Sequence, residues 1–316
     1  MLMKTIAKIS CFVILTAVPV CVLSSCTGVS TNPSLSTSNT VYESPKVIGK
    51  IKLPAIDESS GLAASRCQQN ILWTHNDSGD DAYIYALDLE GNNKGTWRIA
   101  NIENVDWEDI AAYKDKTGEC FLYIGEIGDN KLKRREHFVY RVAEPTISDT
   151  TALATRKNSL AIEAVETVRF VYPDFDQDAE TLMVEPKSGD IYVVTKRVSG
   201  PAGVYRLKPN FGEAQIQRAE KMPEISVPAI PNGFVTGGDI SPDGRRMVIC
   251  DYSQAYEWSL PETVSQFDEI WKQEPTRIDL GKRSGGESVC YSADSLSILA
   301  TSEGRNSPVI EAKRKN

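Results

Sequence analysis

The segment Asp106–Asn130 reads DWEDIAAYKDKTGECFLYIGEIGDN and contains two apolar stretches separated by a turn. The first stretch begins with three carboxylates within four residues, Asp106, Glu108 and Asp109, which surround a tryptophan. The second, FLYIGEI, is rich in the aromatic and β-branched residues typical of strands, and KTGE has the composition of a turn. We therefore predict two antiparallel strands with acids at their open end.

Similar strands recur along the whole chain. Short segments with an apolar or aromatic centre give five equivalent positions, Tyr85, Tyr140, Tyr205, Trp258 and Ile310. These positions are separated by 55, 65, 53 and 52 residues. A period of about 50 residues built from strands is typical of the blades of a β-propeller.

Each repeat contains up to four strands in a constant order. The first strands lie in SSGLAAS, EDIAAY, ETLMVEP, GDISP and ESVCYS, and a more polar fourth strand closes every repeat except the last. Upstream of the first repeat, KVIGKIKLP from Lys46 is a strand without a repeat of its own. A terminal strand can close a propeller and remove its open edge. We predict an all-β fold, a propeller of five four-stranded blades whose last blade is closed by Val47 to Leu53.

Other architectures are compatible with the same pattern. One is a β-sandwich, and another is a ring of six blades with a poorly marked blade between Glu144 and Glu163. Helix patterns are sparse, and the best is Glu262 to Gln273, where apolar residues recur at near-helical spacing. We expect that segment to decorate the connection between two strands.

The first residues have the properties of an export signal. Residues 1–25 run from lysines through an apolar stretch to small residues. Their end, LSS before Cys26, resembles the lipobox of bacterial lipoproteins, which implies a lipid anchor at Cys26 in the outer membrane or on the cell surface. A plain signal peptide is the alternative. Residues 26–45 are rich in Ser, Thr and Asn, so we predict a flexible tether, followed by the propeller domain over residues 46–316.

Charge and cysteine content narrow the possible partners and the compartment. The formal net charge of −8 argues against nucleic acid as a partner. Four cysteines follow the tether, Cys67, Cys120, Cys250 and Cys290, and an oxidising envelope would allow two disulfides. We expect Cys67 to pair with Cys120 and Cys250 with Cys290, and free buried thiols are the alternative.

Acids occupy matching places where the first strands begin. Two residues before the leading apolar position stand Ser60, Glu108, Glu180, Gly238 and Glu287, and two residues earlier stand Glu58, Asp106, Asp178, Thr236 and Gly285. Residues two apart share a strand face, and the first strands of a propeller line its central channel. We therefore expect these acids to converge on the axis at one mouth, with Trp107 and Asp109 pointing the other way.

Carboxylates packed in this way repel one another unless a positive charge lies among them. All-oxygen surroundings favour Ca²⁺ over zinc. The alternative is that these acids only accept hydrogen bonds from backbone amides. We predict a Ca²⁺ site whose metal ligands are Glu58, Asp106, Glu108, Asp178, Glu180 and Glu287.

More polar residues follow the second strands and should rim the same mouth. Acids and cations together could hold a metal ion and an anionic ligand. The basic run KLKRREH from Lys131 is expected to be a solvated loop. The predicted ligand-binding residues are Asp77, Asp129, Asn130, Lys196, Arg197, Asp251, Glu303 and Arg305.

The motifs ESSGL, WTHNDSG, DWEDIA, LYIGEIGDN and GESV resemble the blade starts of calcium-dependent β-propellers. The families concerned are the phytase-like esterase propellers and, more distantly, the five-bladed calcium-activated apyrases. The resemblance covers residues 57 to 143 well and the rest weakly. It implies Ca²⁺ as cofactor, bound by Glu58, Glu108, Glu180 and Glu287. It also implies phosphoester hydrolysis, in which Lys196, Arg197 or Arg305 would stabilise charge.

Two classes of function follow from the sequence, and whether the protein is an enzyme stays open. A lipid-anchored module that binds a small molecule or a protein at its mouth is favoured, because no nucleophile or acid–base pair stands out. A calcium-dependent hydrolase of phosphoesters is the alternative. A glycosidase with paired carboxylates is a weaker alternative.

Overall fold

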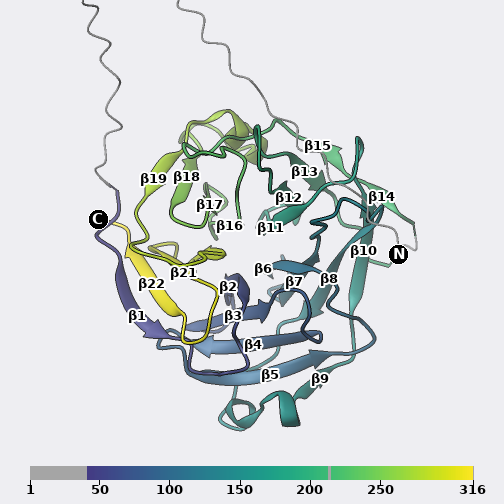
Figure 1. The fold of residues 1–316 in the computed structure, drawn as a ribbon, viewed down its shortest axis with the longest axis vertical. Coiled ribbons are helices and arrows are strands. Elements are labelled where there is room, and N and C mark those ends of the chain that lie inside the picture. Colours follow the sequence, from purple (N-terminus) through teal and green to yellow (C-terminus); the bar gives the residue numbers. More distant parts are fainter. Residues whose placement is uncertain (1–40, 213–214, 316) are drawn as a thin grey trace, which may run out of the picture. The chain divides into compact units, whose positions relative to one another are not determined.

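The computed structural model describes residues 41–212 and 215–315. Figure 1 shows small β-sheets arranged around a common centre, and there are five of them. The predicted signal, Cys26 and the predicted tether up to residue 40 lie outside the described residues. Within the described part of the chain, no helix has the length and apolar content needed to cross a membrane.

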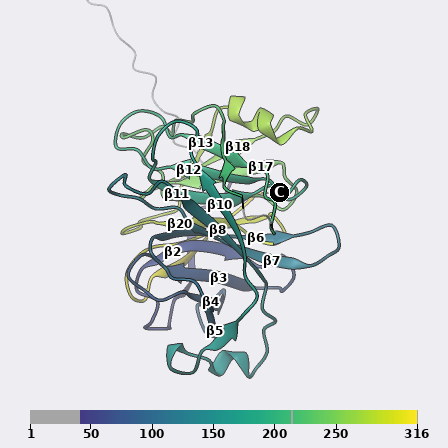
Figure 2. The same ribbon diagram turned by 90° about the vertical axis from the view of Figure 1, so that its right-hand side faces the viewer.

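Each sheet is built on an antiparallel meander of strands that runs from the centre of the ring to its edge. Figure 2 shows this order for blade 1, whose strands lie one below the other from β2 to β5. Blade 1 contains β2 (Ser59–Ala64), β3 (Ile71–Asn76), β4 (Tyr83–Asp88) and β5 (Asn93–Ile99), and blade 2 contains β6 (Trp107–Lys114), β7 (Cys120–Glu126), β8 (His137–Ala143) and β10 (Glu166–Val171). Blade 3 contains β11 (Ala179–Val184), β12 (Ile191–Thr195), β13 (Val204–Leu207) and β15 (Glu220–Lys221), and blade 4 contains β16 (Gly237–Ile240), β17 (Arg246–Cys250), β18 (Ala255–Ser259) and β19 (Thr276–Ile278). Blade 5 contains β20 (Ser288–Tyr291), β21 (Ser297–Thr301), β22 (Pro308–Lys313) and β1 (Lys46–Lys50).

The ring of blades is closed. The inner strands β2, β6, β11, β16 and β20 each lie against the next, and β20 lies against β2. The early strand β1 pairs antiparallel with β22, from Lys46 opposite Glu311 to Lys50 opposite Pro308. The predicted five-bladed propeller and its closing strand are therefore confirmed, because β1 covers the edge that blade 5 would otherwise expose.

Two blades carry an additional strand that the sequence pattern did not predict. The stretch from Glu144 to Glu163 forms no sixth blade. It contains the 3-10 helices η1 (Thr151–Leu153) and η2 (Arg156–Asn158) and the strand β9 (Leu160–Ile162), which adds to blade 1 parallel to β5. The predicted fourth strand of blade 3 is divided, because β14 (Gln217–Arg218) joins blade 2 parallel to β10 and only β15 joins blade 3.

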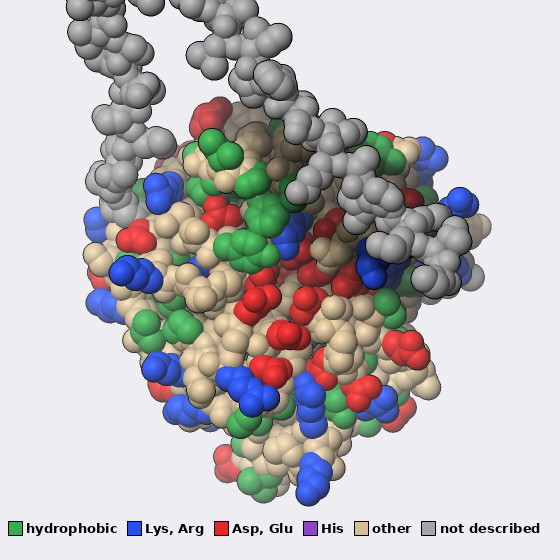
Figure 3. All heavy atoms as spheres, viewed as in Figure 1, with side chains coloured by type: hydrophobic (Ala, Val, Ile, Leu, Met, Phe, Trp, Pro, Cys, Tyr) green, Lys and Arg blue, Asp and Glu red, His purple; other side chains and the backbone are tan. Residues whose placement is uncertain are grey.

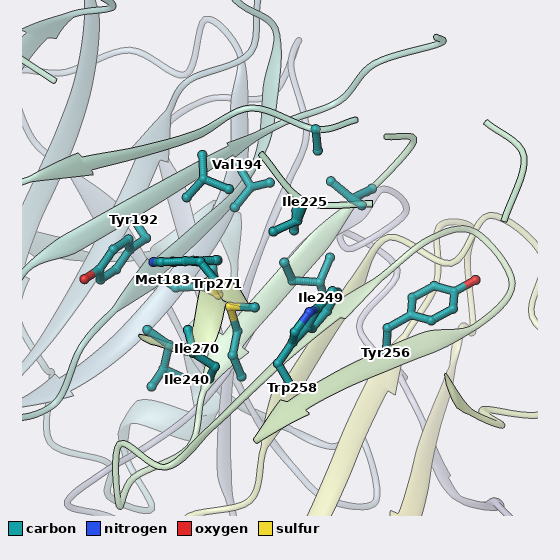
Figure 4. Packing of buried hydrophobic residues seen from close by; sticks show 14 of the residues in the cluster. Met183, Tyr192, Val194, Ile225, Ile240, Ile249, Tyr256, Trp258, Ile270 and Trp271 are labelled. Atoms are coloured by element: carbon teal, nitrogen blue, oxygen red, sulfur yellow. The ribbon is translucent and has the colours of Figure 1, made fainter. Parts of the chain in front are cut away.

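The hydrophobic core consists of five clusters, each between two neighbouring blades. Figure 4 shows the cluster between blades 3 and 4, where Met183 and Tyr192 of blade 3 meet Ile249 and Trp258 of blade 4. Trp271 of the 3-10 helix η3 (Phe267–Lys272) covers this cluster. The segment predicted as a helical decoration thus contains a short 3-10 helix that buries apolar surface between two blades.

Ordered contacts begin before Lys46. Tyr42, which lies within the predicted tether, is buried, and its hydroxyl donates to Glu257 of blade 4. It also forms an isolated β-bridge with Arg314. The end of the predicted tether is therefore part of the folded domain.

One predicted disulfide is present and the other is wrong. Cys67 and Cys120 are bonded and connect the turn after β2 in blade 1 to the first residue of β7 in blade 2. Cys250 and Cys290 are buried free thiols. Cys250 faces the core between blades 4 and 5, whereas Cys290 faces the core between blades 5 and 1. Because β20 separates these two faces, the thiols cannot meet.

Candidate metal centre

Acidic side chains gather where the inner strands begin. The second strand of each blade runs antiparallel to the first, so the loops that follow the second strands reach the same end of the central channel. We call this end the mouth. Figure 3 shows a group of acidic side chains at the middle of this face.

Two glutamates project into the mouth from irregularities of their strands. Glu108 is the extra residue of a β-bulge in β6, where the register shifts between its two neighbours. Glu180 has the same place in β11. A bulge leaves the extra residue out of the ladder, bends the strand and redirects its side chain. The bulges thus aim both carboxylates at the channel axis.

Five carboxylates from three blades meet in this mouth. Asp77, Asp106 and Glu108 each place an oxygen within 4.8 Å of the others, and so do Glu108, Asp178 and Glu180. Glu108 belongs to both sets. We call these five residues the carboxylate cluster. Four of them are predicted metal ligands, whereas Asp77 was predicted as a ligand-binding residue of the rim.

Burial and mutual repulsion make these carboxyls hard to ionise. Burial raises the pKa of Glu108 well above its ordinary value, and the charge of Glu180 adds to the rise. Burial also raises the pKa of Glu180 to about 7 and that of Asp106 to about 6. Nearby carboxylates contribute to both of these rises. A bound cation would remove the repulsion that keeps protons on the cluster.

Two further predicted ligands, Glu287 and Glu58, lie apart from the cluster. Glu287 is 5% exposed, and its Oε2 has no hydrogen-bond partner among the described residues. Burial raises its pKa to about 8, and the charge of Glu180 adds to the rise. Glu58 is exposed at the edge of the mouth. Neither belongs to a set of three close carboxylates within the described chain.

Gly128 provides space for the cluster. A Cβ atom built on Gly128 would overlap Oε1 of Glu108 and lie 2.6 Å from Oδ2 of Asp106. The glycine backbone thus forms one wall of the cluster, and its amide donates to the Asp106 carbonyl at 3.2 Å. Any side chain at this position would displace the two carboxylates.

The loop that carries Asp106 is fixed from behind by Glu126. The carboxylate of Glu126 accepts the backbone amides of Val105 and Asp106, both at 2.9 Å. Arg134 pairs with this carboxylate at 2.6 Å and donates to the carbonyl of Gly128 at 2.9 Å. Arg134 belongs to the basic run that was expected to be a solvated loop, so that expectation is wrong for this residue. Arg134 follows the end of the GEIGDN motif by four residues. This short separation is the sequence signal from which its role beside the motif could have been predicted.

Lys196 brings a positive charge to the cluster. Its ammonium donates to Oε1 of Glu180 at 2.8 Å and to the hydroxyl of Tyr252 at 3.0 Å. It also lies 5.1 Å from the ring centre of Phe234 and 5.2 Å from that of Tyr252. Burial alone would lower the pKa of Lys196, but the charge of Glu180 and the hydrogen bond to it raise this pKa above its ordinary value.

Three other residues of the predicted rim hold the loops of the mouth in place. The backbone amide of Asp129 donates to Asp178 at 2.8 Å, which orients a member of the cluster. Arg197 pairs with Glu224 at 3.0 Å, away from the cluster. The carboxylate of Asp251 accepts two backbone amides of its own loop and the hydroxyl of Tyr256. These three residues therefore stabilise the loops around the mouth through their own contacts.

The remaining rim residues are exposed to solvent. Asn130, Glu303 and Arg305 stand at the surface, and Arg305 lies 3.4 Å from Asp57. Of the eight predicted ligand-binding residues, the structure brings Asp77 and Lys196 into the centre of the mouth. Two aromatic residues that the sequence did not single out, Phe234 and Tyr252, line the mouth beside Lys196.

Polar side chains connect the inner strands below the cluster. Asp109 was expected to point away from the axis, but its carboxylate accepts the backbone amides of Leu182 in blade 3 at 3.0 Å and of Gly238 in blade 4 at 3.4 Å. The bulge at Glu108 is the reason, because it breaks the alternation of side chains along β6. Farther along the channel, Arg66 donates to both carboxylate oxygens of Asp239, at 3.1 and 2.9 Å. The floor of the mouth is therefore polar.

Comparison with known proteins leaves the function open. No family model matches the sequence, and no curated protein matches it. Among solved structures, the chain is similar to a gluconolactonase from Xanthomonas campestris, with 10% sequence identity and a TM-score of 0.43. That similarity covers 86% of this chain and 95% of the other. At this level of similarity the comparison assigns no activity to this chain.

Proposed function

We propose that the protein is a Ca²⁺-dependent binding module that holds a small anionic ligand at the mouth of its propeller. The observation that carries the proposal is the carboxylate cluster, in which two sets of three close carboxylates share Glu108. An arrangement of this kind is unfavourable without a cation, because each buried charge raises the pKa of the next.

The residues present fit Ca²⁺. The cluster offers carboxylate oxygens, which Ca²⁺ prefers, and contains no nitrogen or sulfur donor that would favour zinc. The unpartnered oxygen of Glu287 supplies a second sign that the mouth is completed by something beyond the protein. When bound, the ion would neutralise the cluster and offer positive charge to oxygen atoms of a ligand.

The chain itself orients the ligand. Lys196 uses two of its three N–H donors for Glu180 and the hydroxyl of Tyr252. The third donor is available to an oxygen of an anion in the mouth. Lys196 and the ion would together attract an anion to a surface that is otherwise acidic.

The pair formed by Lys196 and Glu180 also favours a second function, the hydrolysis of phosphoesters. The ammonium donates to Oε1 of Glu180 at 2.8 Å. It can stabilise charge that develops on a phosphate oxygen, and the Glu180 carboxylate, kept ionised by the bound ion, holds it in place. Binding is placed first because it needs the ion and Lys196 alone, whereas hydrolysis also needs a positioned nucleophile.

The location is part of the proposal. The export signal and the lipobox-like sequence at Cys26 support a module anchored by lipid to the outer membrane or the cell surface. Its partners would be the membrane, through that anchor, and a small molecule or protein at the mouth. Metabolic labelling with a fatty acid analogue tests the anchor, and a Cys26→Ser variant should lose the label.

Calorimetric titration of the chelator-treated full chain with CaCl₂ tests the function. We expect saturable binding that Glu180→Gln weakens by about tenfold or more. Glu136→Gln is the matched control, because Glu136 is a half-buried acid paired with Arg169 outside the cluster. Absence of calcium binding in the unmodified chain would overturn the proposal. A panel of phosphate esters, assayed with and without CaCl₂, then decides between binding and hydrolysis.

A further inference from the structure

A second cavity adjoins the mouth on the side of blade 4. Its volume is about 400 Å³, and its walls include Pro228, Ile230, Pro231, Phe234, Tyr252 and Tyr256. Two loops build it, residues 228–234 before β16 and residues 251–254 after β17. Figure 3 shows hydrophobic side chains directly beside the acidic group at the middle of this face.

The walls of the cavity are mainly apolar, include the polar residues Ser253, Gln254 and Arg277, and are partly open to solvent. Ile230 is 100% exposed, so it gains nothing from the core and presents its whole side chain outward. The one acid in the wall, Asp251, is already satisfied by Ser253, Gln254 and Tyr256, with bonds of 2.7, 2.7 and 2.8 Å. It therefore requires no cation from a ligand. An exposed apolar surface of this kind, next to a polar centre, is typical of a ligand pocket.

Tyr252 joins the cavity to the carboxylate cluster. Its ring is part of the cavity wall, and its hydroxyl accepts a hydrogen bond from Lys196 at 3.0 Å. The ring centres of Phe234 and Tyr252 lie 5.3 Å apart at an angle of 56°. Lys196 in turn reaches Glu180 at 2.8 Å. One small molecule can therefore contact the positive centre and the aromatic walls at the same time.

We infer that the ligand of the mouth is a small anion that carries an aromatic or branched aliphatic group. Its anionic end lies at Lys196 and the ion, and its apolar end lies against Phe234, Tyr252 and Ile230. The cavity volume falls in the usual range for small-molecule sites, and aromatic walls favour rings through edge and offset stacking. This inference rests on the proposed function, since it names the ligand class of the same site.

Competition between two anions tests the inference. Phenyl phosphate and inorganic phosphate share one charged group, and only the former has a ring. Calorimetry on the full chain in saturating CaCl₂ should show phenyl phosphate binding about tenfold more tightly or better. In Ile230→Ser this ratio should fall at least threefold, because the variant removes an apolar wall. Val198→Ser is the matched control, since Val198 is 76% exposed and does not line the cavity.

The outcomes separate the two proposals. Equal affinities for the two phosphates in the calcium-loaded protein would overturn the inference and leave the calcium site intact. An equal loss of the ratio in Val198→Ser and Ile230→Ser would overturn it as well. If CaCl₂ does not bind, the proposed function fails. A preference for phenyl phosphate that disappears in Ile230→Ser would then still support the apolar cavity.

Discussion

Gly128 and Glu108, both of blade 2, are in direct contact in the mouth, and a Cβ atom on the glycine would overlap the carboxylate oxygen Oε1 of the glutamate. The φ angle of Gly128 lies outside the left-handed region. Other residue types can therefore adopt this backbone conformation. Glycine is required because a side chain would collide with the Glu108 carboxylate. The contact connects the GEIGDN motif directly to the candidate metal centre.

Gly128→Ala should therefore lower the affinity for Ca²⁺ by about tenfold or more, because the methyl group displaces Glu108 and Asp106. Urea unfolding in excess chelator should change much less than the affinity, since no core cluster includes this residue. Calorimetric titration of the variant measures the effect. Unchanged affinity would mean that Glu108 does not hold the ion.

Glu108→Gln should have the largest effect on calcium binding of any single change in the cluster. Glu108 belongs to both sets of three carboxylates, so its loss disturbs every member, and we expect the affinity to fall about a hundredfold. Without calcium the same variant should be more stable than the parent, because the native state no longer has to keep a proton on this buried carboxyl.

Glu58→Gln is the control variant for Glu108→Gln. Glu58 is exposed and lies outside the cluster, so its removal should change the affinity for Ca²⁺ by less than about threefold. Equal losses in the two variants would show that the mouth acts through its overall charge.

The periodicity of the sequence was sufficient to predict the fold and the proximity of four acids of the carboxylate cluster. Strand alternation predicted that Asp106 lies with Glu108 and Asp178 with Glu180, and the structure brings these pairs together, although bulges rather than regular strands direct the two glutamates. The same rule did not find the place of Asp77. That residue follows the end of β3, and the direction of a loop side chain does not follow the period of a strand.

The other sequence predictions that the structure contradicts fail for equally local reasons. The bulge in β6 reverses the direction expected for Asp109, and no residue type in WEDIA marks a bulge. Cys250 and Cys290 occupy neighbouring blades as predicted, yet they face different cores. Contacts of this kind depend on which face of a blade meets the next blade. A single sequence does not reveal that choice.

The disulfide should stabilise the ring where two blades meet. It connects Cys67 and Cys120, which are 53 residues apart in the sequence. Loop-closure entropy predicts a loss of about 4 kcal/mol in unfolding free energy when both cysteines are replaced by serine. Urea unfolding of the double variant measures this loss. Calcium affinity should stay the same, because the bond joins the turn after β2 to the start of β7, at the opposite end of the strands from the cluster.

The stability of the calcium-free protein should fall as the pH rises from about 5 to about 8. Burial raises the pKa of Glu180 to about 7 and that of Glu287 to about 8, from an ordinary 4.5. Between these values the unfolded chain releases protons that the native state retains, so a higher pH favours unfolding. Surface acids with a lowered pKa, such as Asp174, have the opposite effect, because their stabilisation is lost as the pH falls. That loss occurs only below this pH window.

Each of these two groups contributes on the order of 3 kcal/mol to the change, before their coupling reduces the sum. Saturating CaCl₂ should flatten the part of the dependence that comes from Glu180, because the ion holds the cluster ionised in the native state. Glu287→Gln should flatten the upper part of the window even in chelator, since it removes the group with the higher pKa. Urea unfolding across this pH range, with chelator and with CaCl₂, measures both slopes. A stability that rises with pH in chelator would contradict the electrostatic account of the mouth.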